Sequence, residues 1–267
     1  MGKPMVLNLL KAGHQLFLSS RSEMPKAFAE QGATICTNTT EAAKRADIVW
    51  IMVPGTPHVQ DVLLGVLFGE SGEAKGLKKS ASGRNARLGE LVVDMGLISP
   101  MATKLFAKKI NDPGCEYLDA PVSGAGVGAR AASPTTMVGG PQAAFDRVKL
   151  LLRRMGKNIS LVGGNVNGDG QTTKVANQIT VALHIDAVAK ALLFASNASA
   201  TASAKVREAL IGCFAASRVL TVHGERMVKR SFKPGFRSEL HQKDLNLAQQ
   251  EAKEQGWRCR TWRVRRR

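Results

Sequence analysis

Residues 47–55 of the chain have the sequence DIVWIMVPG. The six consecutive apolar residues 48–53 are followed at once by Pro54-Gly55, a pair that ends regular secondary structure. An apolar run of this length without polar alternation is typical of a β-strand covered on both faces. We therefore predict an interior strand of a parallel sheet that carries helices on both sides.

Shorter segments around this strand alternate between strand and helix patterns up to about residue 162. Strands are predicted at 16–18, 33–36, 91–94 and near 161–162, and helices at 3–12, 23–31, from Thr39, from about Pro57 and from Pro100. Thr39 is expected to cap its helix without a capping box, because Ala42 stands where Glu or Gln is needed. The alternation predicts an α/β domain over residues 1–164.

The pattern changes at about Gly168, after which only helices are expected. They are predicted at 171–198, 203–211, 215–229 and 240–254. Inside the long Ala-rich first helix, His184 is expected to be a core residue. We therefore predict an all-α domain over residues 165–256, followed by a disordered basic tail at 257–267.

Two segments interrupt the α/β pattern. Residues 62–69 hold the near-repeat VLLG-VLFG, and residues 78–89 form a basic run rich in Ser and Gly. Both are predicted to be surface insertions or errors in the gene model.

Composition narrows the functional class. The chain has 267 residues with 44% hydrophobic and 22% charged residues, which excludes wholesale disorder and fibrous proteins. Four scattered cysteines predict reduced, buried thiols in a cytoplasmic protein, and the histidines have no metal-ligand spacing. Because no run reaches about 18 apolar residues, no membrane span is expected. The net charge of +17 favours polyanions, but six Arg of the last eleven residues contribute to it.

Ligand-binding loops are expected where parallel strands end, beyond their carboxyl ends. The candidate loops are 19–22, 54–58, 95–100 and 121–129. The last follows the sequence DAPVSGAGVGA at 119–129, whose backbone N–H groups and serine hydroxyl suit a carboxylate or phosphate. A plain glycine turn fits the same residues equally well.

Lys174, Asn177 and Gln178 are spaced to share one face at the start of the long helix. The electropositive helix N-terminus is expected to lower the pKa of Lys174 and suit it to proton transfer, although a solvated surface lysine is the alternative. Lys243 is a second candidate for an anionic ligand, with a surface charge pair to Asp244 as the alternative.

Several longer motifs occur in a characteristic order. They are IMVP at 51–54, YLDAPVSG at 117–124, MVGG at 137–140, GDGQTTKVANQ at 168–178, FKPGF at 232–236 and LHQKDL at 240–245. In these motifs the chain resembles the β-hydroxyacid dehydrogenases over about residues 2–254. The resemblance implies a Rossmann-type parallel sheet domain followed by an all-α domain for substrate contacts and oligomerisation. It also implies NADP or NAD as cofactor.

The resemblance assigns roles to individual residues. Lys174 is the expected general acid, which protonates the alkoxide formed when a short 3-oxo acid is reduced. The substrate-binding residues are expected to be Ser123, Gly124, Ala125, Asn177 and Gln178. The cofactor-binding residues are expected to be Gly2, Ser20, Arg21, Val53, Pro54, Gly96 and Lys243. No metal ligand is expected.

The expected reaction is the reduction of tartronate semialdehyde (2-hydroxy-3-oxopropanoate) to D-glycerate, or a related 3-hydroxyacid dehydrogenase reaction. Arg21, with no acidic residue after the second strand, favours the 2′-phosphate of NADP, and NAD remains open. Neither a membrane nor nucleic acid is expected as a partner, and a complete chain is expected to form a homo-oligomer. The alternative is an inactive family member whose basic surface binds polyanions.

The chain departs from the family pattern in several places. The family begins with a strand and G-x-G-x-x-G, of which Gly2 alone remains, and the family sequence stops after Lys253. Gly96 replaces a hydroxyl residue near the nicotinamide, and Ala125 stands where a second glycine is usual. We expect a truncated or frameshifted reading frame to explain the altered ends and the two interrupting segments.

Overall fold

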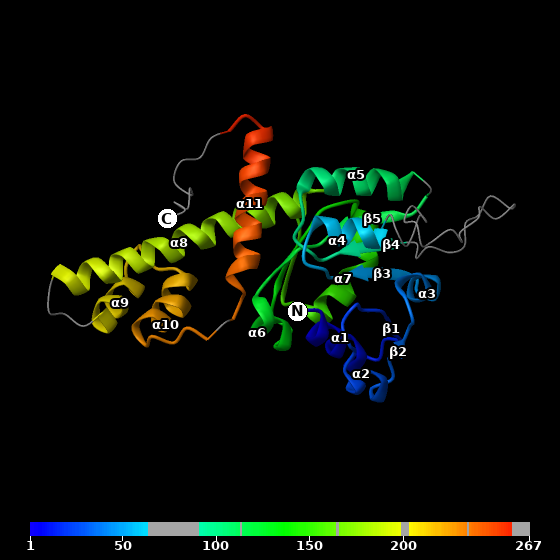
Figure 1. Ribbon diagram of the computed structural model, residues 1–267, viewed down its shortest axis with the longest axis horizontal. Coiled ribbons are helices and arrows are strands. Elements are labelled where there is room, and N and C mark those ends of the chain that lie inside the picture. The colour runs from blue at the N-terminus through cyan, green and yellow to red at the C-terminus, as the bar shows by residue number, and fades with distance from the viewer. Residues whose placement is uncertain (64–90, 113, 164–165, 199–202, 234, 258–267) are drawn as a thin grey trace, which may run out of the picture. The chain divides into compact units, whose positions relative to one another are not determined.

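The computed structural model describes residues 1–63, 91–112, 114–163, 166–198, 203–233 and 235–257. It divides into two compact units, Met1–Lys174 and Val175–Arg267 (Figure 1). The predicted insertions at 62–69 and 78–89 and the predicted tail lie outside the described residues, apart from Val62, Leu63 and Trp257.

The first unit alternates strands and helices, which confirms the predicted α/β fold. Its strands are β1 (Phe17–Leu18), β2 (Thr34–Ile35), β3 (Ile48–Ile51), β4 (Leu91–Asp94), β5 (Glu116–Asp119), β6 (Val122–Ser123), β7 (Thr135–Val138) and β8 (Asn158–Leu161). Its helices are α1 (Gly2–Lys11), α2 (Lys26–Glu30), α3 (Thr39–Lys44), α4 (Thr56–Gln60), α5 (Pro100–Asn111), α6 (Ala125–Arg130) and α7 (Gln142–Met155).

The strands form three hydrogen-bonded groups. β1 and β2 pair in parallel, and β3, β4 and β5 form a parallel sheet with β4 in the centre. In the third group β7 and β8 are parallel, but β6 is antiparallel to β7. The short antiparallel strand β6 was not predicted and adds to the parallel strands that were expected. The chain turns back after Asp119, where the Pro121 carbonyl accepts a hydrogen bond from the N–H of Met137 at 3.0 Å.

The central strand β4 explains why the sequence has unbroken apolar runs. Leu91 and Val93 point into a cluster lined by α1 and α7, and Val92 points into a second cluster with α3 and α5. Because successive side chains of a strand face opposite sides, a strand covered on both faces needs apolar residues at every position.

Two helices start differently from expectation. α3 is capped by Asn38 and not by Thr39, because the Asn38 side chain accepts the N–H of Glu41 at 2.9 Å. The shift by one residue places Glu41 at the third helical position, from where its carboxylate accepts the N–H of Thr37 at 2.8 Å. α2 begins only after Pro25, later than predicted.

Helix α8 (Asp169–Ala198) begins in the first unit and continues into the second. The second unit also contains α9 (Ser203–Ile211), the π-helical turn η2 (Leu220–Gly224), α10 (Glu225–Val228) and α11 (Ser238–Glu254). The predicted helix at 215–229 is thus shorter and contains a π turn. Val188 and Leu192 of α8 pack against Val219 and Leu220, beside α9 and α10 (Figure 1).

Much of α8 is apolar and exposed. By length and composition it qualifies as a membrane-spanning helix, with 11% of its most apolar window buried. The expectation of no membrane span rested on runs of consecutive apolar residues, which isolated polar residues interrupt in α8, whereas the average hydropathy of a window tolerates them. A single helix of this kind is weak evidence for a membrane. His184 was wrongly expected in the core and is exposed, as is Cys213.

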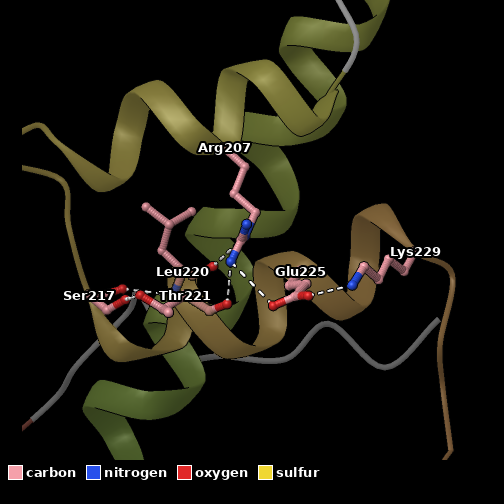
Figure 2. A network of polar contacts seen from close by, with 6 residues as sticks. All are labelled: Arg207, Ser217, Leu220, Thr221, Glu225 and Lys229. Carbon is pink, nitrogen blue, oxygen red and sulfur yellow. Dashed lines mark hydrogen bonds and ion pairs between the residues drawn. The ribbon is translucent and has the colours of Figure 1, made fainter.

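Arg207 of α9 organises the turn that precedes α10 (Figure 2). Its guanidinium donates to the carbonyl oxygens of Leu220 at 3.3 Å and Thr221 at 2.6 Å, and lies 3.6 Å from the Glu225 carboxylate. Lys229 donates to the same carboxylate at 2.6 Å. This hydrogen bond and the charges of Lys229 and Arg207 lower the pKa of Glu225.

Candidate active site

The loops that follow β3 and β4 meet at one edge of the sheet. Ile51 and Asp94 are paired at the ends of these strands, and the N–H of Met95 donates to the Ile51 carbonyl at 2.8 Å. A Cβ on Gly96 would lie 2.9 Å from the Val53 carbonyl oxygen. Val53, Pro54 and Gly96, all predicted cofactor contacts, therefore belong to two loops whose backbones are in close contact. The two loops lie beyond the carboxyl ends of parallel strands, where dinucleotides bind in such sheets.

A buried carboxylate fixes the Gly96 loop. Asp94 is fully buried, accepts the N–H of Gly96 at 2.8 Å and accepts the Tyr117 hydroxyl at 3.1 Å. Burial, with the nearby charges of Asp94 and Asp119, raises the pKa of Tyr117 well above its ordinary value. Tyr117 therefore stays a neutral hydrogen-bond donor to Asp94.

The other predicted cofactor residues of the first unit lie near its surface. The Ser20 hydroxyl accepts the N–H of Ser22 at 3.1 Å, and Arg21 forms a 2.9 Å ion pair with Asp61 in which both side chains are more than half exposed. Gly2 opens α1, and a Cβ there would be 3.5 Å from the Met52 side chain, an ordinary contact. An exposed guanidinium of this kind suits a phosphate, whereas the packing around Gly2 does not require glycine.

The predicted substrate loop joins β6 to α6. Ser123 ends β6 opposite Thr135. Gly124 adopts a φ of 148°, and a Cβ there would lie 3.1 Å from the Cα of Pro134. Ala125 has a φ of 51°, a left-handed conformation that costs a non-glycine residue about 1 kcal/mol. The N–H groups of the first turn of a helix have no acceptor within it, so this loop offers backbone donors and a hydroxyl for a carboxylate.

The start of α8 is held by a fully buried carboxylate. Asp119 accepts the N–H groups of Gly168 at 2.7 Å and Gln171 at 2.9 Å. A Cβ on Gly139 would lie 2.7 Å from the carboxylate, and one on Gly170 would lie 2.5 Å from the Met137 carbonyl oxygen. The MVGG and GDGQ motifs therefore hold glycines because β7 and α8 approach each other around Asp119.

Burial and hydrogen bonding act in opposite directions on Asp119. Burial raises the pKa of this carboxyl, and the N–H groups of Gly168 and Gln171 lower it, with burial as the larger effect. The carboxyl is therefore a cap for α8 that resists ionisation more than an exposed aspartate does.

Lys174 follows one turn after this capped start. Its residue is 7% exposed, so the solvated surface lysine considered above does not describe it. Asn177 and Gln178 continue the same helix in the second unit. The Asn177 amide donates to the Gln178 side chain at 2.9 Å, and Gln178 donates to Asp244 of α11 at 2.6 Å.

Lys243 lies beside this amide network. Its ammonium is 3.0 Å from the Asp244 carboxylate, and the exposed fractions of the two side chains are 31% and 4%. Asp244 is therefore a buried carboxylate shared by Gln178 and Lys243, not half of a surface pair. The role of Lys243 towards a cofactor stays a prediction.

Four buried polar residues beside these loops and helix starts received no role from the sequence, namely Asp94, Asp119, Gln171 and Asp244. Asp119 and Gln171 lie inside quoted motifs, so their positions were noted without a role. The signal available was a charged or amide residue within an apolar or glycine-rich segment, which needs partners when buried. Within the described residues, no three His, Cys, Asp or Glu side chains are grouped as metal ligands.

Known proteins match almost the whole chain. Residues 1–164 match the NAD binding domain of 6-phosphogluconate dehydrogenase, and residues 168–265 match the NAD-binding domain of NADP-dependent 3-hydroxyisobutyrate dehydrogenase. The 2-hydroxy-3-oxopropionate reductase of Escherichia coli K12 is 52% identical over 95% of this chain and 81% of its own. The chain belongs to the β-hydroxyacid dehydrogenase family.

Two further relatives agree with this family. The mitochondrial 3-hydroxyisobutyrate dehydrogenase of Drosophila melanogaster is 34% identical over 93% of this chain and 74% of its own. The Mycobacterium tuberculosis 3-hydroxyisobutyrate dehydrogenase structure with L-serine has a TM-score of 0.79 at 28% identity, covering 98% of this chain and 86% of that one. This β-hydroxyacid dehydrogenase is thus an oxidoreductase that uses NAD or NADP, and the similarities do not support the inactive, polyanion-binding alternative.

Proposed function

We propose that the chain reduces 2-hydroxy-3-oxopropanoate to D-glycerate. The identity of 52% to a 2-hydroxy-3-oxopropionate reductase over 95% of the chain carries this choice of substrate. The buried Lys174 on a capped helix start supplies the acid that the reaction needs. The loops of Val53 and Gly96 would hold the dinucleotide, which would supply the hydride.

The residues of the chain then have distinct tasks. As hydride reaches the carbonyl carbon, the carbonyl oxygen gains negative charge, and the Lys174 ammonium gives its proton to that oxygen. The Ser123 hydroxyl and the N–H groups at Gly124 and Ala125 hold the substrate carboxylate. The amides of Asn177 and Gln178, ordered by Asp244, orient the substrate beside Lys174.

Replacing Lys174 by Met tests the acid. The variant Lys174→Met should lose about 100-fold or more in kcat and keep its dinucleotide affinity, because general acid catalysis contributes about 10²–10⁴-fold. Lys190→Met is the matched control, since Lys190 is on the same helix in an exposed ion pair with Asp186. Equal turnover of the two variants would contradict the role of Lys174.

A panel of hydroxy acids tests the choice of substrate. Initial rates of oxidation are compared for D-glycerate, which is the proposed product, and for 3-hydroxyisobutyrate and 2-(hydroxymethyl)glutarate, which the names of two relatives give. The proposal expects the highest kcat/KM with D-glycerate. A higher value for either of the others would replace the substrate while keeping the reaction class.

We further propose that Arg21 favours NADP by pairing with its 2′-phosphate. Arg21→Glu should weaken NADPH binding at least tenfold and NADH binding little, as measured by fluorescence titration. Asp61→Asn is the control, because it removes the present partner of Arg21 and leaves the guanidinium in place. If Arg21→Glu weakens both dinucleotides equally, the assignment fails.

We also propose that a second copy of the chain covers the apolar surface of the second unit. Leu193 and Phe194 of α8 are 61% and 74% exposed, and a helix that is apolar all round is normally covered. Sedimentation should find a homo-oligomer that Phe194→Glu dissociates. A wild-type monomer would refute this, and binding of that monomer to lipid vesicles would favour a membrane surface instead.

A further inference from the structure

The side chain of Gln171 joins two segments that are 75 residues apart in sequence. Its amide Nε2 donates to the Gly96 carbonyl at 2.9 Å, and its Oε1 accepts the N–H of Ile98 at 3.1 Å. Gln171 and Ile98 are both fully buried. The side chain therefore bridges the loop after β4 and the first turn of α8.

The neutral amide of Gln171 satisfies both backbone groups of the loop at once. The loop presents one acceptor at Gly96 and one donor at Ile98, and glutamine supplies one donor and one acceptor on the same terminal group. A carboxylate has no donor for the Gly96 carbonyl, and methionine has neither. Leaving both backbone groups buried without partners is costly, so this position requires a side chain with both a donor and an acceptor.

The same residue is also fixed to β5 by its backbone. The N–H of Gln171 donates to Asp119 at 2.9 Å, so its main chain and its side chain are both held. Lys174 lies three residues later on the same face of α8, about 4.5 Å further along the helix axis. Any shift of the Gly96 loop relative to the helix start must therefore break a bond of Gln171.

We propose that Gln171 is a positioning residue for the reduction. It sets the distance between the Gly96 loop, which holds the cofactor under the proposed function, and Lys174, which donates the proton. The inference rests on that proposed function. Because a displacement of about 1 Å between reacting groups can cost about 100-fold in rate, loss of this bridge acts on the chemical step more than on substrate affinity.

Three variants test the bridge. Gln171→Met keeps the length and removes both hydrogen bonds, and kcat is expected to fall at least tenfold while KM changes less than threefold. Ile110→Ala is the control for lost stability alone, because Ile110 is buried in an apolar cluster of α5. The two variants are compared by kcat, KM and the primary isotope effect with deuterated cofactor, which should rise only in Gln171→Met.

Gln171→Glu gives a readout that a purely structural role would not move. When protonated, the introduced carboxyl has one donor and one acceptor, as the amide does, and when ionised it has acceptors only. The ratio of its kcat to that of the wild type should therefore rise as the pH falls. The corresponding ratio for Gln171→Met should stay constant with pH.

Hydrogen exchange supplies a measurement that needs no turnover. In Gln171→Met, amides of residues 95–99 and of the first turn of α8 should exchange faster together, and in Ile110→Ala they should not. Kinetics equal to those of Ile110→Ala, or unchanged exchange at either segment, would overturn the positioning role. A wild-type chain that oxidises none of the three hydroxy acids would overturn the proposed function, and the exchange experiment would still decide whether Gln171 couples the two segments.

Discussion

The polar network around Asp119 at the start of α8 and the one around Arg207 in the second unit differ in burial. The first is fully buried and consists of a carboxylate, an amide and backbone groups, with glycines packed against it. The second joins charged side chains at the surface, where Glu225 is 46% and Lys229 is 68% exposed (Figure 2). Both networks connect segments that are separate in sequence.

The difference lies in how much each network restricts its surroundings. A buried polar group without a partner costs about 1–3 kcal/mol, and close backbone contacts leave no space for an extra atom. Exposed charges can exchange a lost partner for water, and they contribute little. We therefore expect the α8 start to tolerate almost no substitution and the Arg207 network to tolerate most.

The largest loss of stability is expected when a methyl group is added at Gly170, beside the buried network. In Gly170→Ala the Cβ would lie 2.5 Å from the Met137 carbonyl oxygen and 2.8 Å from the Asp119 carboxylate. This should lower the free energy of unfolding by about 3 kcal/mol, which exceeds the helix-propensity gain of about 1 kcal/mol. Urea unfolding of the purified variant measures it.

Gly224→Ala is the matched substitution in the second unit. Gly224 has a helical φ of −59°, and its Cβ would meet side chains no closer than 3.4 Å. Its free energy of unfolding should change by less than about 1 kcal/mol. Equal losses in the two variants would contradict the contrast between the networks.

Asp119→Asn should give the next largest effect. The amide can accept only one of the two N–H groups, and its NH₂ faces the other, at a cost of about 2 kcal/mol. Because burial raises the pKa of Asp119 in the folded chain, its contribution is complete below the unfolded value of 3.8 and declines as the pH rises through the folded value. The stability gap between wild type and variant should therefore narrow from acid towards neutral pH. A gap that widens with pH would mean that the N–H groups outweigh burial.

The sequence predicted the order of the elements better than their polar connections. Unbroken apolar runs identified β3 and β4, since both faces of these strands are covered. Pro100 located the start of α5, and the structure adds Ser99 as the cap, which accepts the N–H of Ala102. These signals are local, so they are visible without the fold.

The buried connections depend on residues far apart in sequence. Gln171 and Gly96 are 75 positions apart, and Asp119 and Gln171 are 52 positions apart, so no local pattern announces either contact. The reversal at β6 and the cap at Asn38 were missed for a different reason. β6 has only two residues, too few for a periodic pattern, and Asn38 and Thr39 both satisfy the local rule for a helix cap.

A smaller effect is expected at Arg207. Arg207→Met retains an apolar stem of similar length and removes the donors to Leu220 and Thr221. The contact with Thr221 is exposed and the contact with Leu220 is part-buried, so the loss in free energy of unfolding should be about 1 kcal/mol. A loss as large as that of Gly170→Ala, measured by urea unfolding, would show that the turn is as restrictive as the α8 start.

Glu225→Gln should have the smallest effect. The hydrogen bond from Lys229 and the charges of Lys229 and Arg207 lower the pKa of Glu225, so its contribution is present above the unfolded value of 4.5 and is lost as the pH falls through the folded value. The Tm of the variant should therefore be slightly lower than that of the wild type at neutral pH and equal to it at acid pH. Because the charges are exposed, 1 M salt should also remove the difference. A difference that persists in salt would place Glu225 with the buried residues, and the contrast between the two networks would then depend on Arg207 alone.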